Sequence, residues 1–109
     1  MKRLLWLAMV VSTPASAAPI YLTCVFGNPD YPIEITVDEE GAWATVYLRH
    51  SGYRKTSRAT FTADTVMFSD DVEPYELSRI DLKIIRGERG SRRMMAGLCA
   101  IKETPKRAF

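Results

Sequence analysis

The hydrophobic and polar residues of this chain alternate in short runs, with turn-forming residues about every ten positions. The clearest run contains Ile33, Ile35 and Val37, which alternate with polar residues. A period of two places one set of side chains in a core and the other in water, as in a half-buried β-strand. An acidic turn ends at Gly41, and the chain returns as a second β-rich run over residues 42–49. This pair predicts a β-hairpin.

Other β-rich runs extend the same pattern along the chain: residues 20–26, 59–62, 65–69, 75–86 and 94–101. The alternation over residues 75–86 is imperfect, as a β-bulge near Ser78 to Ile80 would produce. The polar segment 50–57 is expected to connect the first hairpin to the next run. No stretch shows sustained helical periodicity. The sequence therefore predicts an all-β domain, a small antiparallel β-barrel or sandwich of about seven to eight strands.

The first 17 residues have the composition of a signal peptide. Lys2 and Arg3 precede the apolar run 4–11, and the small residues Ala15-Ser16-Ala17 follow Pro14. This order of charged, apolar and small residues is typical of a secretory signal. The apolar run is too short for a bilayer, which needs roughly 20 residues, so no membrane span is expected. We expect cleavage after residue 17, which leaves a single periplasmic or secreted β domain over residues 18–109 with a frayed tail from about residue 102.

Export favours a disulfide between the only two cysteines, Cys24 and Cys99. They lie in the first and last predicted strands and would close a loop of 75 residues. By chain-entropy arithmetic such a bond stabilises a domain by roughly 4 kcal/mol. A bond between these strands would also suit a barrel that closes on itself. Free thiols are the alternative, and a metal site is disfavoured because two cysteines and one histidine do not supply tetrahedral zinc ligands at the usual spacing.

Composition and charge exclude several classes of function. The chain has 109 residues, enough for one small domain, and a formal net charge of +2. Without Lys2 and Arg3 its basic and acidic residues balance, which argues against a nucleic-acid-binding protein. His50 is the only histidine, and the carboxylates near Asp70 are adjacent in a turn rather than opposed across a cleft. We therefore expect no enzyme activity, no metal and no cofactor.

Two basic segments are the candidate binding sites for a partner protein. One contains Ser51, Gly52, Tyr53, Arg54 and Lys55 and is followed by a further arginine at position 58. The other is the glycine-containing loop with Arg89, Arg92 and Arg93. Each segment is either a solvated surface loop or an exposed loop that docks into an acidic cleft, because guanidinium groups bind carboxylates well. The strand aromatics Trp43 and Tyr47 are expected to lie in the core.

These features together resemble the small periplasmic inhibitors of C-type lysozymes. The resemblance rests on the signal peptide, the opening segment Tyr21-Leu22-Thr23-Cys24, the run of short strands and the closing strand with Cys99. It covers the architecture of the chain and part of one loop motif. In that family a Ser-Gly-containing basic loop enters the lysozyme cleft, and its nearest counterpart here is the segment 51–55. The resemblance implies a non-enzymatic binding module that inhibits a lysozyme-like cell-wall hydrolase; the alternative is a structural or envelope-associated accessory protein.

Overall fold

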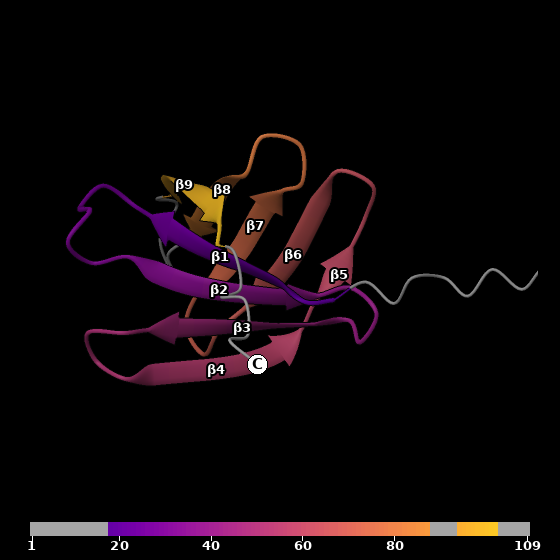
Figure 1. Ribbon diagram of the computed structural model, residues 1–109, viewed down its shortest axis with the longest axis horizontal. Helices are drawn as coiled ribbons and strands as arrows, with labels where there is room; N and C mark the ends of the chain where they lie inside the picture. Colours follow the sequence, from indigo (N-terminus) through magenta and orange to yellow (C-terminus); the bar gives the residue numbers. More distant parts are fainter. Residues whose placement is uncertain (1–17, 88–93, 103–109) are drawn as a thin grey trace, which may run out of the picture.

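The computed structural model describes residues 18–87 and 94–102, and in these two stretches the chain is all β with no helix. Figure 1 shows the strands wrapped around a common interior. The nine strands are β1 (Ile20–Val25), β2 (Ile33–Asp38), β3 (Trp43–Leu48), β4 (Tyr53–Arg58), β5 (Thr60–Phe61), β6 (Thr65–Ser69), β7 (Pro74–Ser78), β8 (Lys83–Gly87) and β9 (Met94–Ile101). The prediction of an all-β domain is confirmed, with more strands than expected. The described residues contain no apolar helix of membrane-spanning length.

The strands form one antiparallel sheet that nearly closes into a barrel. Its order is β4-β3-β2-β1-β9-β8-β7-β6-β5, so all paired strands are neighbours in the sequence except β1 and β9. The first and last strands therefore meet in the middle of the sheet, and the two edge strands are the consecutive strands β4 and β5. Because β4 leads directly into β5, the edges lie close together, and β4 also contacts β6 without pairing with it.

Two expectations about individual strands are wrong. The polar segment 50–57 does not simply connect two runs, because most of it forms β4. The run 75–86 is two strands rather than one bulged strand: β7 ends at Ser78 and a tight turn leads into β8. In that turn the Leu82 amide donates to the Ser78 carbonyl at 3.2 Å, and Leu82 itself has a φ of 63°. The two misassigned segments account for the larger number of strands.

The inward-facing side chains of the strands form the hydrophobic core of the barrel. Leu22, Ile35, Val46 and Ile84 are the largest side chains that are fully buried in it, at no more than 2% exposure. Buried and partly buried positions alternate strictly in β2, with Ile33, Ile35 and Val37 inward as the sequence predicts. Removing this apolar surface from water is the main force that stabilises a domain of this kind.

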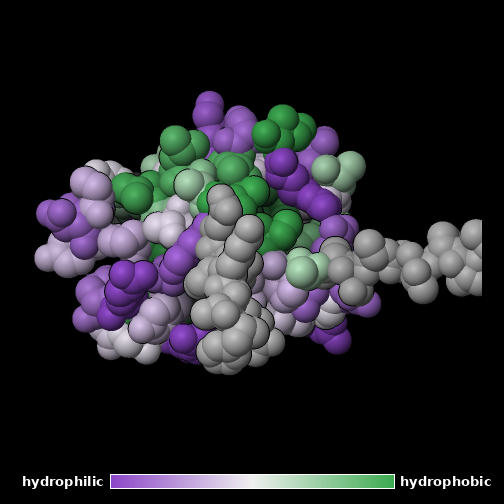
Figure 2. All heavy atoms as spheres, in the orientation of Figure 1, coloured by the Kyte–Doolittle hydropathy of each residue, from purple (hydrophilic) through white to green (hydrophobic). Residues whose placement is uncertain are grey.

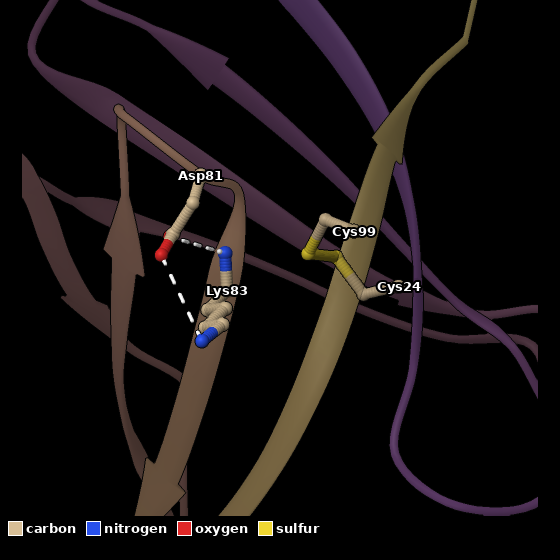
Figure 3. Close-up of a disulfide and its surroundings, with 4 residues drawn as sticks. All are labelled: Cys24, Asp81, Lys83 and Cys99. Atoms are coloured by element: carbon tan, nitrogen blue, oxygen red, sulfur yellow. Dashed lines mark hydrogen bonds and ion pairs between the residues drawn. A yellow bond between two sulfur atoms is a disulfide. The ribbon is translucent and has the colours of Figure 1, made fainter.

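A disulfide joins the first and last strands, as expected. Cys24 and Cys99 are directly opposite each other in the register of β1 and β9, and both are buried. Figure 3 shows the bond between these strands, beside the turn that carries Asp81 and Lys83. The structure describes no free cysteine. The expected signal peptide (residues 1–17) and the tail beyond Lys102 lie outside the described residues.

A candidate binding face on strands β3 and β4

The outer face of β3 and β4 carries aromatic and basic side chains opposite each other. The register pairs Tyr47 with Arg54 and Trp43 with Arg58. Residues directly opposite in an antiparallel pair project from the same face of the sheet. Since Ala44 on β3 is fully buried, its immediate neighbours along the strand point outward. We call Trp43, Tyr47, Arg54 and Arg58 the aromatic–arginine ladder.

The guanidinium of Arg54 lies over the ring of Tyr47, with its central carbon 4.5 Å from the ring centroid. This cation–π contact holds the guanidinium group beside the tyrosine ring on the outer face of the sheet. No ion pair joins Arg54 or Arg58 to another residue in the described part of the chain. The ladder therefore presents two guanidinium groups whose charge no described carboxylate neutralises.

Between the two aromatic pairs, hydroxyl groups fill the outer face. Thr45 on β3 is 8% exposed, and its hydroxyl lies 2.8 Å from the hydroxyl of Thr56 on β4. This side-chain hydrogen bond ties the edge strand to its neighbour in addition to the backbone ladder. The ladder therefore lies on a hydrogen-bonded strand pair rather than on a loop.

The acidic residues next to the ladder are engaged elsewhere. On β2, Glu34 lies opposite Tyr47, but its carboxylate pairs with Arg49 and with Lys102 at 3.6 Å. Although burial opposes ionisation, the hydrogen bond from Arg49 and the charge of Lys102 lower the pKa of Glu34. Asp38 lies opposite Trp43 and accepts the Gly41 amide at 3.1 Å. Glu34 and Asp38 therefore have other partners, and neither forms an ion pair with Arg54 or Arg58.

The predicted site at residues 51–55 divides between a turn and the two faces of β4. Ser51 and Gly52 lie in the turn after β3, where the Gly52 amide donates to the Leu48 carbonyl at 2.8 Å. Gly52 has a φ of +78°, which glycine adopts without steric cost. Arg54 points outward and belongs to the ladder, whereas Tyr53 and Lys55 have the opposite orientation. The five residues therefore do not form one continuous binding loop.

Tyr53 and Lys55 turn toward the gap between β4 and β6, and both contact Asp71. The Tyr53 hydroxyl donates to the Asp71 carboxylate at 3.0 Å, and the Lys55 ammonium lies 3.0 Å from its other oxygen. Further along β4, the Ser57 hydroxyl donates to the Ser69 carbonyl at 2.6 Å. We call these contacts of Tyr53, Lys55 and Ser57 the polar seam. These contacts connect β4 to β6 and the segment that follows it, so Tyr53 and Lys55 already have a polar partner within the protein, unlike Arg54.

The other candidate residues of the sequence analysis are placed as follows. Arg89, Arg92 and Arg93 lie outside the described residues. His50 is exposed in the turn after β3 and packs edge-to-face on Tyr31, with ring centroids 5.2 Å apart. Among the described residues no cluster of three or more histidine, cysteine, aspartate or glutamate side chains has the geometry to hold a metal ion.

The carboxylates near Asp70 are part of a hydrogen-bonded turn. One oxygen of Asp70 accepts the amides of Val72 and Glu73 at 2.8 and 2.7 Å. The other accepts the hydroxyl of Tyr75 at 2.8 Å. Burial, followed by this hydrogen bond, raises the pKa of Tyr75. The arrangement fixes the β6–β7 turn. Asp70 is held by hydrogen bonds within this turn, as expected for carboxylates that are adjacent in a turn.

Sequence reasoning placed Trp43 and Tyr47 in the core, and this is wrong. Both are partly exposed on the outer face, and neither belongs to the hydrophobic core cluster. The signal that could have identified them is the alternation along β3, because Ala44, Val46 and Leu48 occupy the inward positions. Figure 2 shows hydrophilic residues gathered on the side where β3 and β4 lie and hydrophobic residues on the opposite side of the view.

Comparison of the chain with protein-family models, with curated proteins and with solved structures finds no match.

Proposed function

We propose that the protein is an exported, non-enzymatic binding module that docks the aromatic–arginine ladder against an acidic surface of a partner protein. The observation that carries the proposal is the pair of outward guanidinium groups, Arg54 over Tyr47 and Arg58 opposite Trp43. Arginine and aromatic residues are enriched at the centres of protein interfaces, and arginine binds carboxylates through two parallel hydrogen bonds. A ladder held by a strand pair binds with little loss of conformational entropy.

The partner that best fits this chemistry is a lysozyme-like cell-wall hydrolase. Such enzymes carry a pair of carboxylates across a cleft, and a guanidinium group complements that charge. A disulfide in so small a domain is consistent with an exported protein, which would meet such hydrolases outside the cytosol. The resemblance to lysozyme inhibitors supports the same partner. In our proposal Arg54 enters the cleft, while Ser51 and Gly52 shape the adjacent turn.

The direct test is binding of the oxidised protein to a purified C-type lysozyme, measured by calorimetry alongside inhibition of cell-wall lysis. The double variant Arg54→Ala, Arg58→Ala should weaken binding about 100-fold, because loss of two interface arginines typically costs a few kcal/mol. Binding should also weaken as salt rises, since the contact depends on charge.

Two further variants identify the cause of such a loss. Arg54→Lys keeps the positive charge but loses the planar group that stacks on Tyr47, so it should recover only part of the affinity. Lys83→Ala on β8 removes one positive charge far from the ladder in the sheet order and should bind normally. No binding by the native protein would overturn the hydrolase as partner. Normal binding by the double alanine variant would overturn the ladder as the site.

A second candidate function, a structural protein that packs into a larger envelope assembly, is favoured by the outer face of β8 and β9. The outward positions of β9 are all apolar, and Leu98 and Met94 are 59% and 67% exposed. Strands that are apolar on both faces are usually covered on both faces. Sedimentation of the oxidised protein tests this function. A concentration-dependent oligomer that Leu98→Lys dissociates would support it, and a strict monomer would count against it.

A further inference from the structure

One end of the barrel contains a cavity of about 240 Å³ that no part of the proposed function uses. Its apolar walls come from several strands and one turn, among them Leu22 of β1, Val37 of β2, Phe61 of β5, Val66 of β6, Leu77 of β7, Leu82 of the following turn and Ile101 of β9. We call it the end cavity. Most of its wall is aliphatic, and it opens to solvent beside Ile20 and Ile101, which are 44% and 59% exposed.

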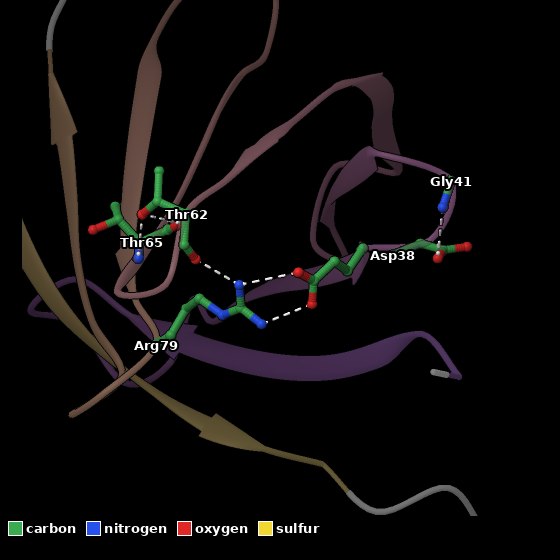
Figure 4. A network of polar contacts seen from close by, with 6 residues as sticks. Asp38, Gly41, Thr62, Thr65 and Arg79 are labelled. Carbon is green, nitrogen blue, oxygen red and sulfur yellow. Dashed lines mark hydrogen bonds and ion pairs between the residues drawn. The ribbon is translucent and has the colours of Figure 1, made fainter. Parts of the chain in front are cut away.

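The rim of the end cavity carries one pair of opposite charges. The Arg79 guanidinium spans from the end of β7 to the turn between β2 and β3, where it binds both carboxylate oxygens of Glu39 at 2.7 and 3.3 Å. It also donates to the Thr62 carbonyl at 2.6 Å. Figure 4 shows Arg79 extended between these segments. The two charges cancel, and much of the donor capacity of the guanidinium is already used.

We propose that the end cavity binds a small, uncharged aliphatic molecule, with its hydrocarbon chain inside and an uncharged polar group at the rim. The size fits: an apolar cavity of about 150 Å³ binds benzene, whereas sites for drug-sized ligands begin at about 300 Å³. The lining fits as well, because an aliphatic wall offers water too few hydrogen-bond partners and gains from contact with hydrocarbon.

The charge pair at the rim selects against charged ligands. A carboxylate that approached Arg79 would meet the carboxylate of Glu39, which already occupies the guanidinium. An ammonium group that approached Glu39 would meet Arg79 in the same way. Displacing either partner would leave a charge without its hydrogen bonds, which is costly. A hydroxyl group needs only one donor or acceptor at the rim and disturbs neither residue.

The test uses three probes with the same chain and different head groups: hexan-1-ol, hexanoate and hexylammonium. They are titrated into the oxidised protein, and binding is followed by the methyl NMR signals of Val66, Leu77 and Leu82. Hexan-1-ol should cause saturable shifts of these signals in the millimolar range, as the small contact area allows. The two charged probes should bind at least tenfold more weakly. Absence of saturable shifts, or a charged probe that binds as tightly as the alcohol, would overturn the proposal.

A matched pair of variants on β9 locates the site. Ile101 lines the end cavity, whereas Ala100 precedes it and points to the opposite face. Both residues are exposed near the end of the strand, so tryptophan can be introduced at either position without filling the core. Ile101→Trp should weaken hexan-1-ol binding at least tenfold, and Ala100→Trp should leave it unchanged. Equal effects of the two variants would show that the alcohol does not bind in the cavity.

The end cavity and the aromatic–arginine ladder can be tested independently. The double variant Arg54→Ala, Arg58→Ala lies on the outer face and should bind hexan-1-ol normally. Ile101→Trp should bind the partner protein normally. A loss of alcohol binding in the double arginine variant would mean that the probe binds at the ladder, which would overturn the cavity as its site.

Discussion

The barrel has two junctions between strands that are not consecutive in the sequence, β1 with β9 and β4 with β6, and they are held in different ways. Where β1 meets β9, four residue pairs lie in antiparallel register and the Cys24–Cys99 disulfide joins the strands. Where β4 meets β6, no ladder forms, and the exposed polar seam of Tyr53, Lys55 and Ser57 makes the contact. One junction is covalent and buried, and the other is polar and accessible to water.

This difference indicates which junction resists local unfolding and which one opens first. A disulfide restricts the unfolded chain, and backbone pairing in a buried sheet excludes water. Exposed ion pairs and hydrogen bonds contribute little, because water competes for both partners. We therefore expect the native state to open locally at β4 long before β1 and β9 separate. The aromatic–arginine ladder lies on the weaker side of the molecule, on the edge strand itself.

The largest effect should come from removing the disulfide. Cys24→Ala combined with Cys99→Ala should lower the free energy of unfolding by roughly 4 kcal/mol, because the bond closes a long loop. Urea unfolding, followed by tryptophan fluorescence, measures the loss. Reduction of the native protein provides the control, since it breaks the same bond without removing the sulfur atoms. A loss below about 1 kcal/mol would show that this junction does not depend on its covalent link.

The strong junction could be predicted from the sequence. Two cysteines in the first and last β-rich runs, after a segment that we expect to be an export signal, predict a bond that brings those strands together. The weaker junction could not, because nothing in the sequence marks Tyr53 and Asp71, 18 positions apart, as hydrogen-bond partners. Nor could β4 itself: its two faces carry Tyr53, Lys55 and Ser57 on one side and Arg54 on the other, so no alternation of apolar and polar residues marks it.

The second prediction concerns a single hydrogen bond of the polar seam. Ser57→Ala removes the hydroxyl that donates to the Ser69 carbonyl, and it should cost about 0.5–1 kcal/mol. Ser69→Ala is the matched control, because it keeps the carbonyl that accepts the bond, and it should be nearly neutral. Hydrogen exchange of backbone amides should accelerate in β4 but not in β1. Uniform acceleration over the barrel would instead show that the seam and the disulfide junction open together.

The aromatic–arginine ladder was only partly predictable, because it too depends on how distant residues pair. The sequence marks Arg54 as part of a basic segment, but it does not show that Tyr47 lies opposite, because that depends on the register of β3 and β4. Ile80 likewise continues a β-rich run in the sequence, yet it is 77% exposed in the turn after β7. Local patterns predict which residues alternate, whereas long-range pairing decides which of them meet.

The smallest effect is a pH dependence of the polar seam. The hydrogen bond from Lys55, and next the one from Tyr53, lowers the pKa of Asp71 in the folded protein. A carboxyl group whose folded pKa is depressed stabilises the native state above its unfolded pKa, and this contribution is lost as the pH falls through the folded value. The protection of β4 amides against hydrogen exchange should therefore fall, relative to the protection of β1 and β9, as the solution is acidified below about pH 4.

Asp71→Asn provides the control for this dependence, because it removes the titrating group while keeping a similar shape. In that variant the β4 amides should be less protected at neutral pH, and acidification should no longer lower their protection relative to β1 and β9. The disulfide between β1 and β9 does not titrate, so those strands report the acid response of the rest of the barrel. If β4 and β9 were to respond to pH in parallel in the native protein, the two junctions would not be independent. The contrast between a covalent and a polar closure would then have no consequence for the dynamics of the edge strand.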